Sequence, residues 1–105
     1  MTIAEFYRKN GELTGFKVKG HSGYAKQGSD IVCASVSSAV MLTANLITEI
    51  FGYNADVSAV GDTVALKTYV SCDETLQRLY KGLVLQLEEI ASEFEGNLKV
   101  QFTEV

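Results

Sequence analysis

The chain has 105 residues, 47% of them hydrophobic, which is enough for one compact domain with its own core and too short for two. We therefore expect a single domain over residues 1–105. The formal net charge is −4, and nine Lys and Arg residues are distributed along the chain. This pattern argues against a nucleic-acid-binding surface, so direct contact with nucleic acid is not expected.

The composition also bears on cellular location and on metal binding. The N-terminal residues, MTIAEFYRKN, contain no apolar run suited to a signal peptide, and no stretch is expected to reach the ~20 apolar residues of a membrane span. We therefore expect a cytoplasmic protein without membrane contact, in which Cys33 and Cys72 are free thiols. One histidine and two cysteines are too few ligands for a zinc site within one chain, so neither a metal nor another cofactor is expected.

Two alternating segments at the start of the chain, residues 3–8 and 13–19, predict a β-hairpin. They flank an Asn-Gly pair at residues 10–11, which suits the positive φ angles of a type I′ turn. The second strand then ends beside His21. This histidine is expected at the rim of a sheet, where the chain leaves for a loop.

An apolar run rich in small residues predicts the first helix, from about residue 31 to residue 50 or 51. Ser29 or Asp30 is expected to open this helix as the N-cap. Cys33 then lies in the first helical turn, where free N–H groups and the helix dipole favour the thiolate, the nucleophilic form. Asp30 has a second predicted role, which is to orient the histidine.

The rest of the chain predicts a second hairpin, a second helix and a last strand. The hairpin strands are residues 56–60 and 63–70, and the last strand is residues 98–103. The order is therefore ββαββαβ. We expect an α+β fold of two layers, with two helices on one face of a mostly antiparallel sheet.

The second helix is marked by apolar residues at helical spacing from Leu76 to Phe94. Ser71 and Glu74 fit a capping box at its start, and Gly96 fits a left-handed stop at its end. These limits place Cys72 in the first turn. No second histidine accompanies Cys72, so an inert thiol is the preferred interpretation there.

The chemistry-bearing residues gather in residues 20–38, GHSGYAKQGSDIVCASVSS, which contain the only histidine and one of the two cysteines. If His21 reaches Cys33, the pair can act as nucleophile and general base. The residues alone leave ordinary interpretations open. A single cysteine at a helix start is usually a small buried hydrophobe, and a single histidine at a strand end is usually a surface residue.

This segment resembles the signature of the ribosomal-processing cysteine protease family, Prp, in Gly20-His21, the twelve-residue step to the cysteine, Asp30-Ile31-Val32-Cys33-Ala34 and Ser37. The resemblance implies a catalytic dyad of His21 and Cys33, supported by Asp30 and Ser37. It implies a cysteine endopeptidase that removes the N-terminal extension of large-subunit ribosomal protein twenty-seven. It also implies a homodimer.

The segment between the two dyad residues contains Gly23 and Gly28. Two glycines give hinge freedom, so we expect a substrate loop that covers the nucleophile. The alternative function is a non-catalytic dimeric module that binds a ribosomal or assembly partner, with Cys33 as a structural thiol. Mild alkylation separates the two hypotheses, because a catalytic Cys33 should react faster than Cys72.

Overall fold

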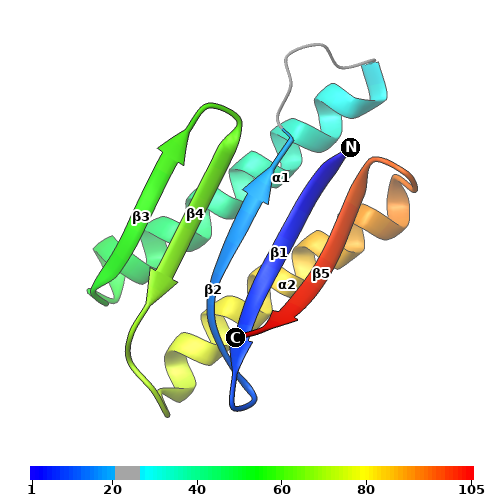
Figure 1. The fold of residues 1–105 in the computed structure, drawn as a ribbon. Coiled ribbons are helices and arrows are strands. Elements are labelled where there is room, and N and C mark those ends of the chain that lie inside the picture. Colours follow the sequence, from blue (N-terminus) through cyan, green and yellow to red (C-terminus); the bar gives the residue numbers. More distant parts are fainter. Residues whose placement is uncertain (21–26) are drawn as a thin grey trace.

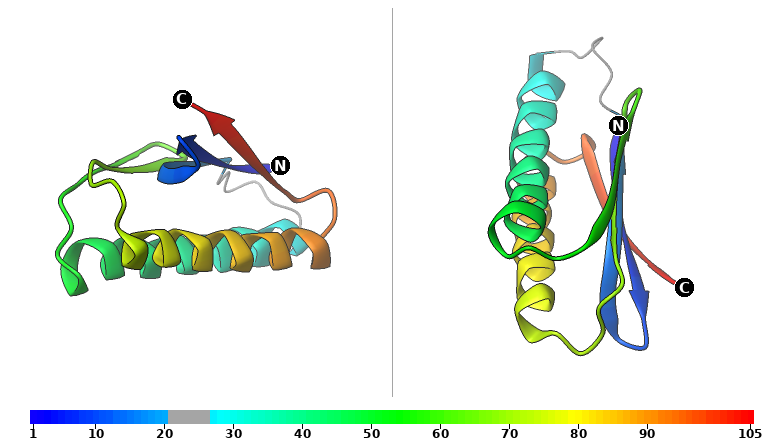
Figure 2. Two further views of the ribbon diagram at one scale, coloured as in Figure 1. Left: turned by 90° about the horizontal axis from the view of Figure 1, so that it is seen from below. Right: turned by 90° about the vertical axis from the view of Figure 1, so that its left-hand side faces the viewer.

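Figure 1 shows the computed structural model, in which residues 1–20 and 27–105 are described, residues 27–30 by their backbone alone. Two helices cover one face of a five-stranded sheet, as the side views in Figure 2 make clear. This confirms the predicted α+β class, the two layers and the order of elements. The elements are β1 (Thr2–Lys9), β2 (Glu12–Lys19), α1 (Gln27–Asn45), the π-helical turn η1 (Leu46–Ile50), β3 (Ala55–Val60), β4 (Thr63–Thr68), α2 (Glu74–Glu93) and β5 (Leu98–Glu104).

The strands lie in the order β3-β4-β2-β1-β5. All neighbouring pairs are antiparallel except β1 and β5, which run parallel, so the sheet is mixed but largely antiparallel. The parallel pair places Thr2 opposite Leu98. The first and last strands of the chain are therefore neighbours in the sheet (Figure 1).

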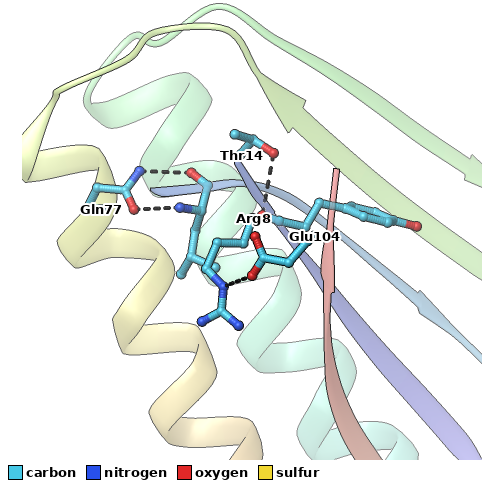
Figure 3. Close-up of polar contacts among 6 residues, drawn as sticks. Arg8, Thr14, Gln77 and Glu104 are labelled. Atoms are coloured by element: carbon cyan, nitrogen blue, oxygen red, sulfur yellow. Dashed lines mark hydrogen bonds and ion pairs between the residues drawn. The ribbon is translucent and has the colours of Figure 1, made fainter. Parts of the chain in front are cut away.

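The first hairpin forms as the Asn-Gly pair predicts, with φ of 52° at Asn10 and 81° at Gly11. A bulge then shifts the register between β1 and β2. Because β2 pairs with β4 only from Gly15 onward, Leu13 lacks a strand neighbour on that side. The side chain of Gln77 on α2 takes that place, accepting from the Leu13 N–H at 2.7 Å and donating to its carbonyl at 2.8 Å (Figure 3).

The core lies between the sheet and the helices. It is built from alternate strand residues and from one stripe of each helix, as the spacing of apolar residues predicts. Its largest fully buried side chains are Tyr80, Phe6, Phe16, Ile47, Leu66, Leu76, Leu87, Val18, Val32 and Val36.

The start of α2 differs from the prediction. The N-cap is Asp73, whose carboxylate accepts from the Leu76 N–H at 3.0 Å and from the Tyr53 hydroxyl at 2.8 Å. The predicted capping box from Ser71 is therefore wrong. Cys72 precedes the helix instead of lying in its first turn, and it has a φ of 58°.

One stretch of the chain, Ile31–Ile50, is 20 residues long and apolar enough to cross a membrane by length and composition. The expectation that no stretch reaches this length is therefore wrong. The stretch is weak evidence for a membrane span, because the core helix of a soluble protein passes the same test. Val32, Val36 and Ile47 from this stretch are part of the core described above.

Candidate functional site

Cys33 lies in the second turn of α1, because the helix begins at Gln27 instead of near residue 31. The prediction of a first-turn cysteine is therefore wrong. Within α1 the N–H groups without a partner inside the helix are those of residues 27–29, one turn or more before the thiol. Since the dipole effect falls off within the first turn, the helix start favours a Cys33 thiolate less than the sequence suggests.

The same early start changes the position of Asp30. Its backbone lies inside α1, three residues after Gln27, whereas an N-cap has a non-helical backbone. Neither Asp30 nor Ser29 is therefore the N-cap of this helix. Gly28 also lies in α1, so it is not part of the predicted loop.

Cys33 is half-buried, and its sulfur lies against the first strand. Its Sγ is 3.8 Å from the Oγ1 of Thr2, the first residue of β1. Thr2 is only 2% exposed, and its backbone N–H donates to the Asn97 carbonyl at 3.0 Å. A buried hydroxyl on a fixed strand is thus a polar neighbour of the thiol.

The backbone around this contact is tightly packed. Gly20 follows β2 with a φ of 104°, and a Cβ at this position would lie 2.7 Å from the carbonyl oxygen of Met1. One end of the sheet therefore brings together the end of β2, the start of β1 and the turn before β5. Cys33 on α1 lies at this same end. The N-terminus marks this end in Figure 1.

The remaining predicted site residues are placed only in part. Ser37 is half-buried and lies four residues after Cys33 on the same helix, which puts both on one face. His21 and Gly23 lie outside the described residues. The proximity of Thr2 was missed by sequence reasoning, because it depends on the packing of α1 against the start of β1, 31 residues earlier in the chain.

Cys72 lies at the other end of the sheet and is exposed. Its backbone N–H donates to the carboxylate of Glu12 at the start of β2, whereas Cys33 lies near the end of that strand. Both cysteines are free, which confirms the sequence prediction. Among residues 1–20 and 27–105, no group of three His, Cys, Asp or Glu side chains is arranged to hold a metal ion.

A concave feature lies between α1 and α2. It is an open groove of about 770 Å³, lined by Ala34, Ser35, Ser38, Ala39, Leu42, Thr43, Leu46, Arg78, Leu79, Gly82, Leu83 and Gln86. Neither Cys33 nor Ser37 contributes to its lining, because they project from a different side of α1. The groove is therefore separate from the thiol, and the sequence analysis did not predict it.

A model of the family described as cysteine protease Prp matches residues 1–99. The chain belongs to the cysteine protease Prp family. The Prp match covers both hairpins, both helices and the whole segment that contains His21 and Cys33. Family membership makes the chain a cysteine protease and favours this interpretation over the non-catalytic module.

Individual relatives agree with the Prp assignment. The ribosomal processing cysteine protease Prp of Bacillus subtilis (strain 168) is 28% identical over 94 residues, covering 84% of each chain. The crystal structure of an essential ribosomal processing protease Prp from S. aureus with a substrate peptide matches with a TM-score of 0.91 and 19% identity, covering 98% of this chain and 100% of that one. The same protease with a covalently linked product peptide matches with a TM-score of 0.87 and 20% identity, with the same coverage. At these identities, the two solved structures show a shared fold.

Proposed function

We propose that the chain is a single cysteine endopeptidase domain in which Cys33 is the nucleophile and His21 the general base. The observation that carries the proposal is the Prp family match over residues 1–99, which includes the histidine-to-cysteine spacing. The half-buried position of Cys33 beside a buried hydroxyl supports it.

The reaction follows from these roles. His21 accepts the thiol proton, and the Cys33 thiolate adds to a peptide carbonyl carbon to give a tetrahedral oxyanion. Backbone N–H groups at the start of α1 are the proposed donors to that oxyanion. Collapse breaks the C–N bond as His21 returns the proton to the departing amine. Water, deprotonated by His21, then hydrolyses the thioester and restores the thiol.

The proposed substrate is large-subunit ribosomal protein twenty-seven with its N-terminal extension. Two names support this assignment: the B. subtilis relative is a ribosomal processing protease, and the S. aureus protease was solved with a substrate peptide. Such a substrate places the enzyme with bacterial ribosomes in the cytoplasm. The partner is then an extended protein tail, and no direct contact with nucleic acid is proposed.

The other predicted site residues are proposed to have separate roles. Ser37 supports Cys33 from the next turn of α1, and Asp30 acts as a charge near the dyad, since its capping role is excluded. Gly23 remains the proposed hinge of a substrate loop. Gly28 belongs to α1 instead, so any role that it has at the site is proposed to come from its place in that helix. Replacing Asp30 by Asn removes the charge alone, so an altered pH profile of cleavage would support the electrostatic role.

Incubation with the extended ribosomal protein, read by mass, tests the function. The wild-type chain should release one N-terminal fragment. Cys33→Ala should abolish cleavage without loss of the fold, and Cys72→Ala, the matched control, should retain it. Continued cleavage by Cys33→Ala would exclude the mechanism.

We also propose a homodimer formed through the outer face of α1. Met41 and Leu42 on this face are 64% and 61% exposed, and residues 31–48 contain no charged side chain. An uncharged apolar patch can pair with its own copy across a two-fold axis. Sedimentation should give a dimer mass for the wild-type chain and a monomer mass for Met41→Glu; a wild-type monomer would exclude the proposal.

A further inference from the structure

We propose that Thr2 stabilises the nucleophilic form of Cys33 by donating a hydrogen bond from its buried hydroxyl to the sulfur. This inference rests on the proposed function, because it assigns a role at the same thiol. Thr2 therefore contacts the reacting atom and is a further catalytic residue, one that none of the sequence motifs contains.

The distance and the burial carry the first step of the argument. Thr2 Oγ1 lies 3.8 Å from Cys33 Sγ, and either atom could be the donor in the neutral thiol. A thiolate carries no hydrogen, so in the ionised state only the threonine hydroxyl can donate. Because hydrogen bonds to a charged group are stronger than neutral ones, this contact gains strength when the thiol loses its proton.

The second step is that the hydroxyl is fixed in place. Thr2 is 2% exposed, so bulk water competes weakly for its hydroxyl. Its backbone is held by the bond to the Asn97 carbonyl and by the parallel pairing with Leu98. The close approach of Gly20 to Met1 limits movement on the other side. The donor is therefore preorganised and needs little rearrangement as charge forms on the sulfur.

The third step concerns the helix. Since α1 begins at Gln27, the free N–H groups that the sequence placed at Cys33 belong to the preceding turn. A neutral donor from the facing strand supplies part of the stabilisation expected from those groups. The contact also links the sheet layer to the helix layer at the sulfur, which holds the Cys33 side chain in one orientation.

Alkylation of the thiol tests this role without a protein substrate. The reference chain is Cys72→Ser, so that Cys33 is its single thiol, and the probe is iodoacetamide over a range of pH. The test variant carries Thr2→Val in addition to Cys72→Ser. This substitution keeps the shape of the side chain and removes the hydroxyl. We expect alkylation to slow by roughly threefold to tenfold at low pH, to converge with the reference at high pH, and so to shift the profile to higher pH.

Two further variants separate the hydroxyl from general packing. Thr2→Ser keeps the donor and should keep the reference profile. Thr43→Val removes another buried hydroxyl on α1, one that bonds to the Ala39 carbonyl at 2.8 Å, and should also keep it. If Thr2→Val is less stable, its rates are corrected for the folded fraction, and Thr2→Ala compared with Thr2→Ser provides the same contrast.

The outcomes distinguish this inference from the proposed function. A Thr2→Val profile that coincides with the reference overturns the role of Thr2, even if Cys33→Ala abolishes cleavage. A shifted profile together with cleavage by Cys33→Ala overturns the protease mechanism and leaves the Thr2 contact standing as a property of the thiol. A shift in Thr43→Val as large as in Thr2→Val also overturns the inference, because it indicates a general packing effect.

Discussion

Gln77 on α2 pairs with the backbone of Leu13 on β2 in the way that a further strand would, with one accepted and one donated hydrogen bond. The contact joins the helix layer to the sheet at the end opposite Cys33. Nearby, Arg8 forms an ion pair with Glu104 at 2.6 Å and lies over the ring of Phe102 (Figure 3 shows the pair). Different contacts therefore stabilise the two ends of the molecule.

Replacing Gln77 by Leu should lower the free energy of unfolding by about 1–3 kcal/mol, because it leaves the N–H and carbonyl of Leu13 without their partner. Urea unfolding measures the change. Gln86→Leu is the matched control, since Gln86 is exposed on the same helix and should change stability little. Equal effects of the two substitutions would show that the Leu13 contact is not stabilising.

Replacement of each of two glycines by alanine should change the stability of the fold in opposite directions. A Cβ on Gly15 would lie 2.4 Å from the carbonyl oxygen of Leu66, and since that atom belongs to the backbone, Gly15→Ala should destabilise by about 1–3 kcal/mol. A Cβ on Gly82, within α2, meets nothing within 4 Å. Gly82→Ala should therefore stabilise by about 0.5–1 kcal/mol. Thermal unfolding of both variants decides the matter, and a stabilised Gly15→Ala would contradict the close strand approach.

Alkaline pH should destabilise the fold through Tyr80. Burial raises the pKa of Tyr80 from 10.0 to about 12, while its hydrogen bond with Thr68 acts in the opposite direction. The neutral form is thus favoured in the folded state. The resulting stability is fully present below pH 10, where the unfolded chain still holds its proton, and is lost as the pH rises toward about 12.

The variant Tyr80→Phe tests this linkage. It cannot ionise, so its stability relative to wild type should improve as the pH rises from 10 to 12 and stay constant between pH 7 and 9. Denaturant unfolding at each pH gives the difference. A difference that does not change with pH would show that Tyr80 does not contribute to alkaline unfolding.

Acid pH should act through Asp73. The Leu76 N–H and then the Tyr53 hydroxyl lower the pKa of this carboxyl below its usual value of 3.8. Its contribution to stability is therefore present above about pH 4 and is lost as the pH falls through the lowered pKa. Asp73→Asn keeps much of the capping and removes the titration, so its stability curve should be flatter on the acid side. Parallel curves for the two proteins would exclude this contribution.

The hairpins and the core-facing stripes were predictable because their signals are local. Asn10 and Gly11 fix a turn, and alternation fixes which strand residues are buried. The order of elements then follows, and so does the two-layer arrangement. The parallel pairing of β1 with β5 was not predicted, since nothing local in either strand distinguishes it.

The starts of both helices were missed for physical reasons. At α2, Ser71 and Asp73 are both good N-cap residues, and the choice of Asp73 is favoured by the Tyr53 hydroxyl, which lies 20 residues away in the chain. At α1, glycines before Cys33 suggested a loop, yet Gly28 is helical. Propensity is a weak guide where tertiary structure decides. The contact of Thr2 with Cys33 spans 31 residues and is likewise invisible to local patterns.

The pairing of β1 with β5 has a consequence for the folding of the thiol site. Asn97, whose carbonyl accepts from the Thr2 N–H, and the neighbouring strand β5 are distant from Thr2 in the chain. Contacts between residues so far apart in sequence are slow to form, because a long loop must close first. The surroundings of the Cys33 sulfur are therefore complete only once β1 has paired with β5, and local opening of β5 should disturb the thiol site.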